Sequence, residues 1–242
     1  MDGLHRNIVE GVVNVASYYS PQGIESLARL PSPSFTQRRM EDLETLVVTK
    51  RVAGFDRGCV DGLRDIIAQA AAGTLGPLKF ITFEFAHDGT GSSAGADGFQ
   101  TLVSEVANLI LRAPVVSVAC ARGYMEGADL EFALACSMLI GEDGATFSFS
   151  GDPVISVGVY GFLAQKIGFV AAERLMEEGE VLQAEQMRQL LLLKDVAERG
   201  DGAGGMEQFL RRTARRHNSC YGIYRAQRIA SPAVDESRRA AS

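Results

Sequence analysis

A run of eight residues that is apolar almost throughout, 114–121, is the feature that most constrains the fold of this chain. Strands buried on both faces read as continuous apolar runs, whereas half-exposed strands alternate. A glycine-containing turn at 122–127 and an Ala- and Leu-rich helical segment at 128–136 follow directly. Strands that alternate with helices in this way form parallel β-α-β units. The sequence therefore predicts an α/β fold with a buried parallel sheet.

The same alternation continues on both sides of this segment. Runs rich in β-branched residues predict further strands, and apolar residues at helical spacing predict helices. The predicted strands are 46–52, 79–85, 138–141 and 146–150, and the predicted helices are 37–43, 59–72, 99–111, 161–168, 170–178, 184–192 and 206–228. We expect three parts, namely an N-terminal extension at 1–45, a core at 46–200, and a C-terminal helical region and tail at 201–242.

Composition excludes several classes of protein. With 242 residues, 46% of them hydrophobic, the chain is long enough to bury a sizeable core. A net charge of −6 disfavours nonspecific binding to nucleic acid, which depends on neutralised phosphates. No apolar run reaches the roughly 18–20 residues that span a bilayer, and Asp2 and Glu10 interrupt the N-terminal apolar stretch, so no signal peptide is predicted. We expect a cytoplasmic protein that binds neither nucleic acid nor membrane.

The cysteines and histidines are scattered along the chain and match neither metal-ligand spacing nor a nucleophile motif. They are Cys59, Cys120, Cys136, Cys220, His5, His87 and His217. We expect reduced thiols, no metal site and no catalytic triad.

Two turns rich in small residues, 92–98 and 123–129, each follow a predicted buried strand and open a helix. In open parallel sheets, ligands bind beyond the carboxyl ends of the strands. N–H groups in the first turn of a helix lack partners within the helix and, with the helix dipole, suit a negatively charged oxygen. Two such groups converging on one carbonyl form an oxyanion hole, where each donor contributes about 3–4 kcal/mol. Each turn alone also has a plain packing explanation.

The order of these pieces resembles the enoyl-CoA hydratase/isomerase (crotonase) superfamily. Residues 113–147 resemble its central signature, in which a "K-P-V-I-A-A-V-x-G" strand leads to "x-x-G-G-G-x-E-L-A-L-A-C-D" and then "A-x-F". Residues 93–97 resemble its upstream "F-x-A-G-A-D" loop. Segments 158–163, 211–218 and 224–228, with Gly168, are similar to the subgroup that makes the diffusible signal factor, a cis-unsaturated fatty acid, which places the chain in fatty acid metabolism by resemblance. The resemblance implies a crotonase-like spiral of β-β-α units with a C-terminal helical region.

The resemblance also implies roles for particular residues. Ala94 and Ala128 take the positions of the two oxyanion-hole donors, and Glu131 takes that of the first catalytic glutamate. A carboxylate beside a polarised carbonyl can take or return a proton α to a thioester. Asp152 is the candidate for the second catalytic carboxylate. Substrate-binding positions fall on Ser93, Gly95, Ala96, Asp97, Gly127 and Gly151.

Two departures from the family pattern leave the activity open. Gly151 stands where hydratases have their second glutamate, and Asp129 adds a negative charge beside the second donor turn, where the family has glycine. Hydration and dehydration need both an acid and a base, so a single carboxylate suits isomerase or thioesterase-like chemistry better. The alternative is a catalytically impaired homologue that serves as an acyl-thioester-binding, regulatory or scaffold protein.

A cluster of basic residues occupies the last predicted helix. Its members are Arg211, Arg212, Arg215, Arg216, His217, Arg225 and Arg228. They form either a solvated basic face or a site for the phosphates of CoA or of an acyl-carrier phosphopantetheine. The resemblance implies an acyl-CoA or acyl-carrier-protein thioester as partner, no cofactor, and a homo-oligomer, either a trimer or a hexamer.

Overall fold

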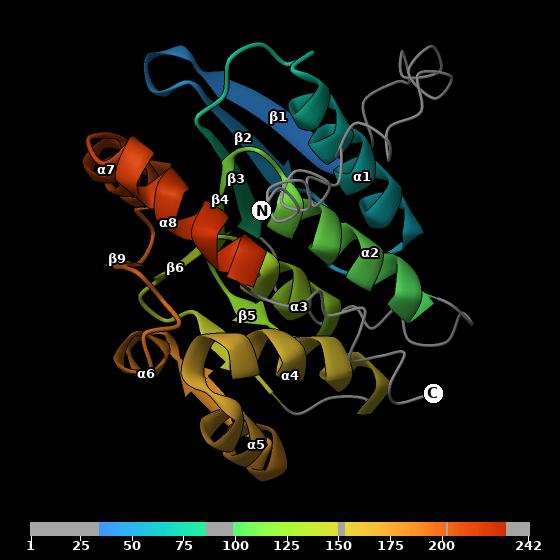
Figure 1. Cartoon of the computed structure of the whole chain (residues 1–242). Helices are drawn as coiled ribbons and strands as arrows, with labels where there is room; N and C mark the ends of the chain where they lie inside the picture. The colour runs from blue at the N-terminus through green and yellow to red at the C-terminus, as the bar shows by residue number, and fades with distance from the viewer. Residues whose placement is uncertain (1–33, 86–98, 150–152, 202, 231–242) are drawn as a thin grey trace, which may run out of the picture. The chain divides into compact units, whose positions relative to one another are not determined.

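The structure is a computed structural model that describes residues 34–85, 99–149, 153–201 and 203–230 (Figure 1). At 153–157 and 227–230 it describes the backbone only. Its centre is a six-stranded sheet in the order β1-β2-β3-β4-β6-β9. The strands are β1 (Phe35–Met40), β2 (Thr45–Lys50), β3 (Phe80–Phe85), β4 (Val116–Ala121), β6 (Met138–Glu142) and β9 (Val196–Ala197). All neighbours pair in parallel except β1 and β2. The predicted α/β class is confirmed.

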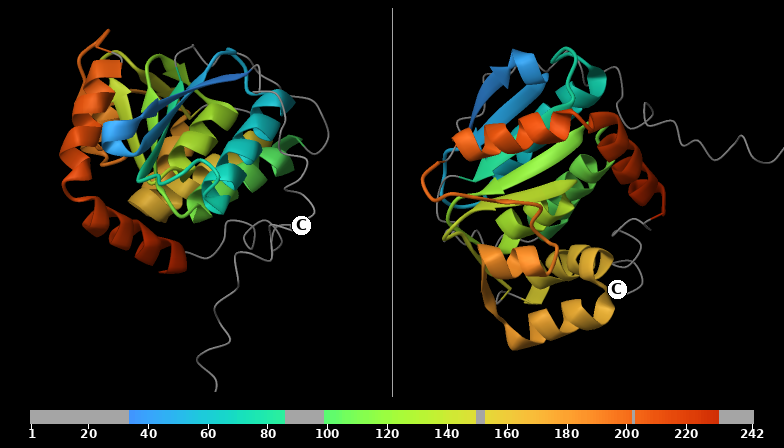
Figure 2. Two further views of the ribbon diagram at one scale, coloured as in Figure 1. Left: turned by 90° about the horizontal axis from the view of Figure 1, so that it is seen from above. Right: turned by 90° about the vertical axis from the view of Figure 1, so that its left-hand side faces the viewer.

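Helices cover both faces of this sheet, because its strands are apolar on both sides. The side chains of Ile81, Phe83 and Phe85 pack with α1 (Arg57–Ala72), α2 (Phe99–Arg112) and α3 (Gly127–Ala135). Side chains of the opposite face, including Phe80, pack with α7 (Ala203–Ala214) and α8 (His217–Ala230). Figure 2 shows α7 and α1 on opposite sides of the strands. Burial on both faces explains the uninterrupted apolar run that the sequence shows at 114–121.

A smaller sheet lies beyond β6 and holds three short strands in the order β5-β7-β8. The strands are β5 (Tyr124–Met125), β7 (Thr146–Ser148) and β8 (Val181–Gln183). The helices between β7 and β9 are α4 (Pro153–Ile167), α5 (Phe169–Glu178) and α6 (Ala184–Gln189). Because β5 immediately precedes α3, this sheet fixes the approach of the chain to the first turn of that helix.

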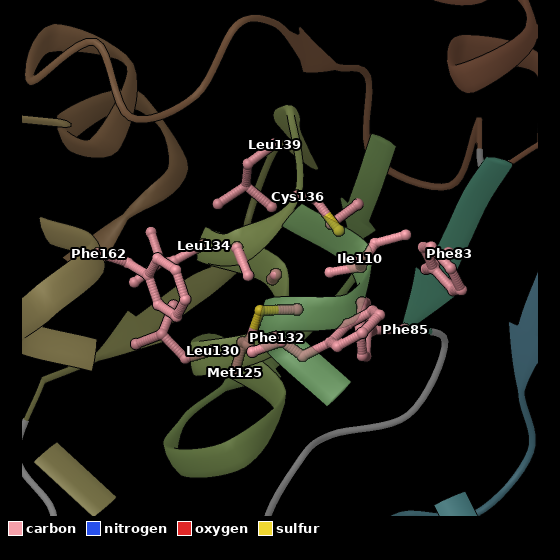
Figure 3. Close-up of a cluster of buried hydrophobic side chains, with 14 of the residues drawn as sticks. Phe83, Phe85, Ile110, Met125, Leu130, Phe132, Leu134, Cys136, Leu139 and Phe162 are labelled. Carbon is pink, nitrogen blue, oxygen red and sulfur yellow. The ribbon is translucent and has the colours of Figure 1, made fainter. Parts of the chain in front are cut away.

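Helix α3 runs through the middle of the apolar core and is buried on all sides (Figure 3). The ring of Phe132 meets that of Phe83 edge to face, with centroids 4.9 Å apart. On another side of the helix, Leu130 and Leu134 lie toward Phe162 of α4 (Figure 3). A helix enclosed in this way holds the residues of its first turn in fixed positions.

Two predicted elements are wrong. Residues 37–43 were expected to form a helix, but 35–40 form an edge strand followed by a 3-10 turn at 41–43. Pairing with β2 supplies the backbone hydrogen bonds that an isolated helix would have made. The predicted helix 206–228 is two helices, which are separated by a turn at 215–216. The sheet thus includes residues that precede position 46, while the three-part division of the chain stays a prediction.

Among the described residues, no group of three or more His, Cys, Asp or Glu side chains is placed to hold a metal ion. No helix in the described ranges is both long enough and apolar enough to cross a membrane.

Candidate functional site

The second predicted donor turn lies at the start of α3, beyond the carboxyl end of β4. Glu126 precedes the helix in an extended conformation, and Gly127 has φ +56°, a left-handed value that favours glycine. The first amide of the helix to bond back is that of Leu130, which donates to the Glu126 carbonyl at 3.4 Å. The N–H of Ala128 therefore precedes the ladder of intrahelical bonds. Its position suits the predicted donor role.

Asp129 is buried, and it pairs with Lys50, the last residue of β2. Lys50 Nζ donates to both carboxylate oxygens, at 2.8 Å and 2.7 Å, and the two side chains are 3% and 5% exposed. The same ammonium donates to the carbonyl of Ala53 at 3.0 Å and lies 5.6 Å from the centroid of the Phe55 ring. Lys50 therefore neutralises the charge that the sequence placed beside the donor turn.

Burial nevertheless raises the pKa of Asp129 to about 6, because desolvation outweighs the opposing effect of Lys50. Removal from water therefore costs the Asp129 carboxylate more than the attraction of Lys50 returns.

Glu131 lies one turn further along α3, and its side chain has no exposed surface. The hydroxyl of Ser104 on α2 donates to its Oε1 atom at 2.7 Å. Gly158 of α4 lies against the carboxylate, because a Cβ atom there would be only 2.1 Å from the carboxylate carbon. Helices α2 and α4 together fix the position of this acid.

Ser104 was missed in the sequence, although a signal for it exists. It is a buried polar residue on the apolar face of α2, alongside Val103, Val106 and Ala107. Buried hydroxyls need hydrogen-bond partners, so an interior serine on such a face indicates a polar group opposite it. Gly158 was noted only as part of a motif, with no role.

The remaining predicted site residues lie outside the described residues. They are Ser93, Ala94, Gly95, Ala96, Asp97, Gly151 and Asp152. The structure brings Gly127, Ala128 and Glu131 together on α3, and the convergence of Ala94 with Ala128 stays a prediction.

A second group of charged residues, also missed in the sequence, ties the carboxyl ends of three strands together. The guanidinium of Arg122, after β4, lies 2.9 Å from Glu84 Oε1 on β3 and 3.4 Å from Glu142 Oε1 on β6. Thr49 Oγ1 of β2 donates to the other oxygen of Glu84 at 2.7 Å. Thr49, Glu84 and Glu142 lie on the face of the sheet whose apolar residues pack on α7 and α8. Together with Arg122 they brace the sheet on that face.

Solved structures with a similar fold are numerous, whereas no family model and no curated protein matches the sequence. An enoyl-CoA hydratase from Mycobacterium avium subsp. paratuberculosis is 18% identical with a TM-score of 0.69, covering 85% of this chain and 87% of its own. A monofunctional enoyl CoA isomerase from M. smegmatis is 17% identical with a TM-score of 0.67, covering 79% and 90%. The chain therefore has the crotonase fold of enoyl-CoA hydratases and isomerases, as the resemblance predicted.

The solved structures also include DspI from Pseudomonas aeruginosa, at 20% identity. The similarity covers 81% of this chain and 81% of DspI, with a TM-score of 0.66.

Proposed function

We propose that this chain is a crotonase-superfamily enzyme that acts on an acyl thioester, carried by CoA or by an acyl carrier protein. The observation that carries the proposal is the placement of Ala128 and Glu131 on one buried helix, with a backbone donor in the first turn and a carboxylate three residues later. Residues three apart on a helix lie on the same side. A thioester carbonyl at the Ala128 amide would therefore bring its α-carbon toward this acid.

In the proposed mechanism, the N–H groups of Ala128 and Ala94 bind the thioester oxygen as negative charge develops on it. Glu131 takes a proton from the acyl chain and returns it at another carbon. Ser104 fixes the position of the carboxyl group by donating its hydroxyl hydrogen to Oε1. Since Lys50 pairs with Asp129, that carboxylate would not oppose the developing oxyanion.

A single carboxylate supports an isomerase, or a thioesterase-like reaction through a tetrahedral intermediate. Dehydratase chemistry would require Asp152 as a second acid or base. The proposed assembly is a homotrimer or hexamer, as the resemblance implies, and the CoA or carrier thioester is its partner.

The second candidate is a homologue that binds acyl thioesters without turning them over. The enclosure of Glu131 favours it, because the side chain is 0% exposed and is closed in by Ser104 and Gly158. Such a protein would keep the Ala128 amide for binding and lack access to the acid.

The test is to incubate the protein with 3-enoyl-CoA, 3-hydroxyacyl-CoA and acyl-carrier thioesters, following double-bond absorbance and free thiol. The matched variants are Glu131→Gln, which removes the acid isosterically, and Glu177→Gln, which changes an exposed glutamate on α5. We expect turnover that Glu131→Gln lowers at least a hundredfold and Glu177→Gln leaves unchanged. No turnover, together with thermal stabilisation by CoA thioesters, would support the binding protein instead.

A further inference from the structure

Two of the four lysines in the chain have no acidic partner among the residues that the structure describes. Lys50 pairs with Asp129, and Lys79 pairs with Glu44. Lys166, at the end of α4, and Lys194, just before β9, form no ion pair within the described part of the chain. Both nevertheless line the same pocket.

This pocket, which we call the lysine pocket, has a volume of about 210 Å³ and lies at the carboxyl end of α3. Its walls include Ser137, Leu139 and Phe162, and none of the described residues that line it is acidic. The backbone carbonyl of Cys136, at the end of α3, lies 3.5 Å from Lys166 Nζ. One weak carbonyl contact is a small compensation for two ammonium groups in one pocket.

The electrostatics of the pocket favour an anion. Desolvation lowers the pKa of Lys166 to about 8, although the side chain keeps exposed surface; Cys136 opposes this lowering, and the charge of Lys194 adds a smaller lowering effect. Two like charges that destabilise each other are stabilised by a negative group between them. A purely structural role, in which the Lys166 ammonium caps carbonyl groups at the end of α3, would explain the position of Lys166. It would not explain why Lys194 lines the same pocket.

A second and larger cavity adjoins the lysine pocket. Its volume is about 570 Å³, and it shares Met138, Lys194 and Tyr224 with the lysine pocket. Phe209 of α7 extends its apolar surface. The cationic side chains of Arg212, Arg215 and Arg216 also line it, with Asp195 as the only acid among the described lining residues. Arg212 and Asp195 pair with each other.

We propose that these adjoining cavities form a binding site for an amphipathic anion. The carboxylate or phosphate head lies between Lys166 and Lys194, and the apolar tail lies over Met138, Phe209 and Tyr224. Charge complementarity supports this occupant, because a strongly basic patch stands out on a chain whose net charge is −6. The volume of the larger cavity is within the usual range for small-molecule sites, roughly 300–1,000 Å³.

The site is separate from the proposed thioester site. Ala128 lies in the first turn of α3 and Ala135 lies at the other end of that helix, which at about 1.5 Å per residue places them about 10 Å apart. Binding at the lysine pocket therefore does not depend on the proposed catalytic role of Glu131.

The test is isothermal titration of the full chain, in a phosphate-free buffer, with decanoate, decyl phosphate, inorganic phosphate and decanol. We expect decanoate or decyl phosphate to bind at least tenfold more tightly than inorganic phosphate or decanol, with the tighter one identifying the head group. Lys166→Met and Lys194→Met should each weaken that binding at least tenfold. Arg174→Met, which removes an exposed cation on α5, is the matched control and should leave it unchanged.

Lys194→Met is the decisive variant, because the Lys194 side chain is exposed and its loss should leave the fold intact. Binding that survives Lys194→Met, or decanol binding as tight as that of decanoate, would overturn the proposal. Inorganic phosphate binding as tightly as decyl phosphate would also overturn it, because the tail would then contribute nothing.

Discussion

Replacing Lys50 by Met should destabilise the protein severely, because it leaves the Asp129 carboxylate without its cation. Both side chains are almost fully buried, and Lys50 donates to both carboxylate oxygens. Removing one partner of a buried ion pair costs about 3–5 kcal/mol. That is a large share of the roughly 5–15 kcal/mol by which a typical domain is stable.

The cost should depend on pH and on the second partner. Asp129 in the Lys50→Met variant can escape its unpaired charge by taking up a proton, so the deficit should be smaller at pH 5 than at pH 8. The double variant Lys50→Met/Asp129→Leu removes both charges and should recover most of the lost stability, because apolar replacements of buried pairs are often neutral or better.

Urea unfolding at pH 5 and pH 8 measures these differences. Arg174→Met is the control, because its exposed pair with Glu178 should be worth less than about 1 kcal/mol. A loss below about 1 kcal/mol for Lys50→Met, or a double variant no more stable than the single one, would refute the reasoning.

Three further predictions concern α3 and two residues that contact it. Asp129→Asn should remove a pH dependence of stability. Because burial raises the pKa of Asp129 from 3.8 to about 6, the folded state binds a proton that the unfolded state has lost, so wild-type stability should fall relative to the variant as pH rises from 4 to 6. The reverse slope in urea titrations would contradict this. Gly158→Ala should lower the melting temperature and the stability by about 1–3 kcal/mol, since its Cβ must displace the Glu131 carboxylate, whereas unchanged stability would mean that the carboxylate moves freely. Ser104→Ala should cost about 1–3 kcal/mol by removing a buried hydroxyl donor and should shift the pH profile of turnover, and an unaltered profile would remove Ser104 as a positioning residue.

The central strands and helices could be predicted because their patterns are local. The apolar run at 114–121, the glycine turn after it and the small-residue helix at 128–136 each carry their own periodicity, and the structure has β4 and α3 at these places. The strand at 35–40 was missed because an edge strand is defined by its pairing with β2, and its own burial pattern does not alternate.

The partners of the site residues could not be predicted, because they are distant in the sequence. Lys50 and Asp129 are 79 residues apart, and Ser104 and Glu131 are 27 apart. Asp129 read alone was an unpaired charge that weakened the oxyanion-hole hypothesis. The compensating charge becomes visible only in the folded chain, where Lys50 at the end of β2 lies beside Asp129 at the start of α3.

The most direct test of the proposed function is a crystal structure with an acyl-CoA analogue in which a methylene group replaces the thioester sulfur, so that the carbonyl is kept and cannot be hydrolysed. We expect the carbonyl oxygen about 2.7–3.1 Å from the Ala128 nitrogen, with Glu131 facing the α-carbon. An analogue whose carbonyl contacts neither Ala128 nor Ala94, or whose acyl chain lies away from Glu131, would contradict the proposal.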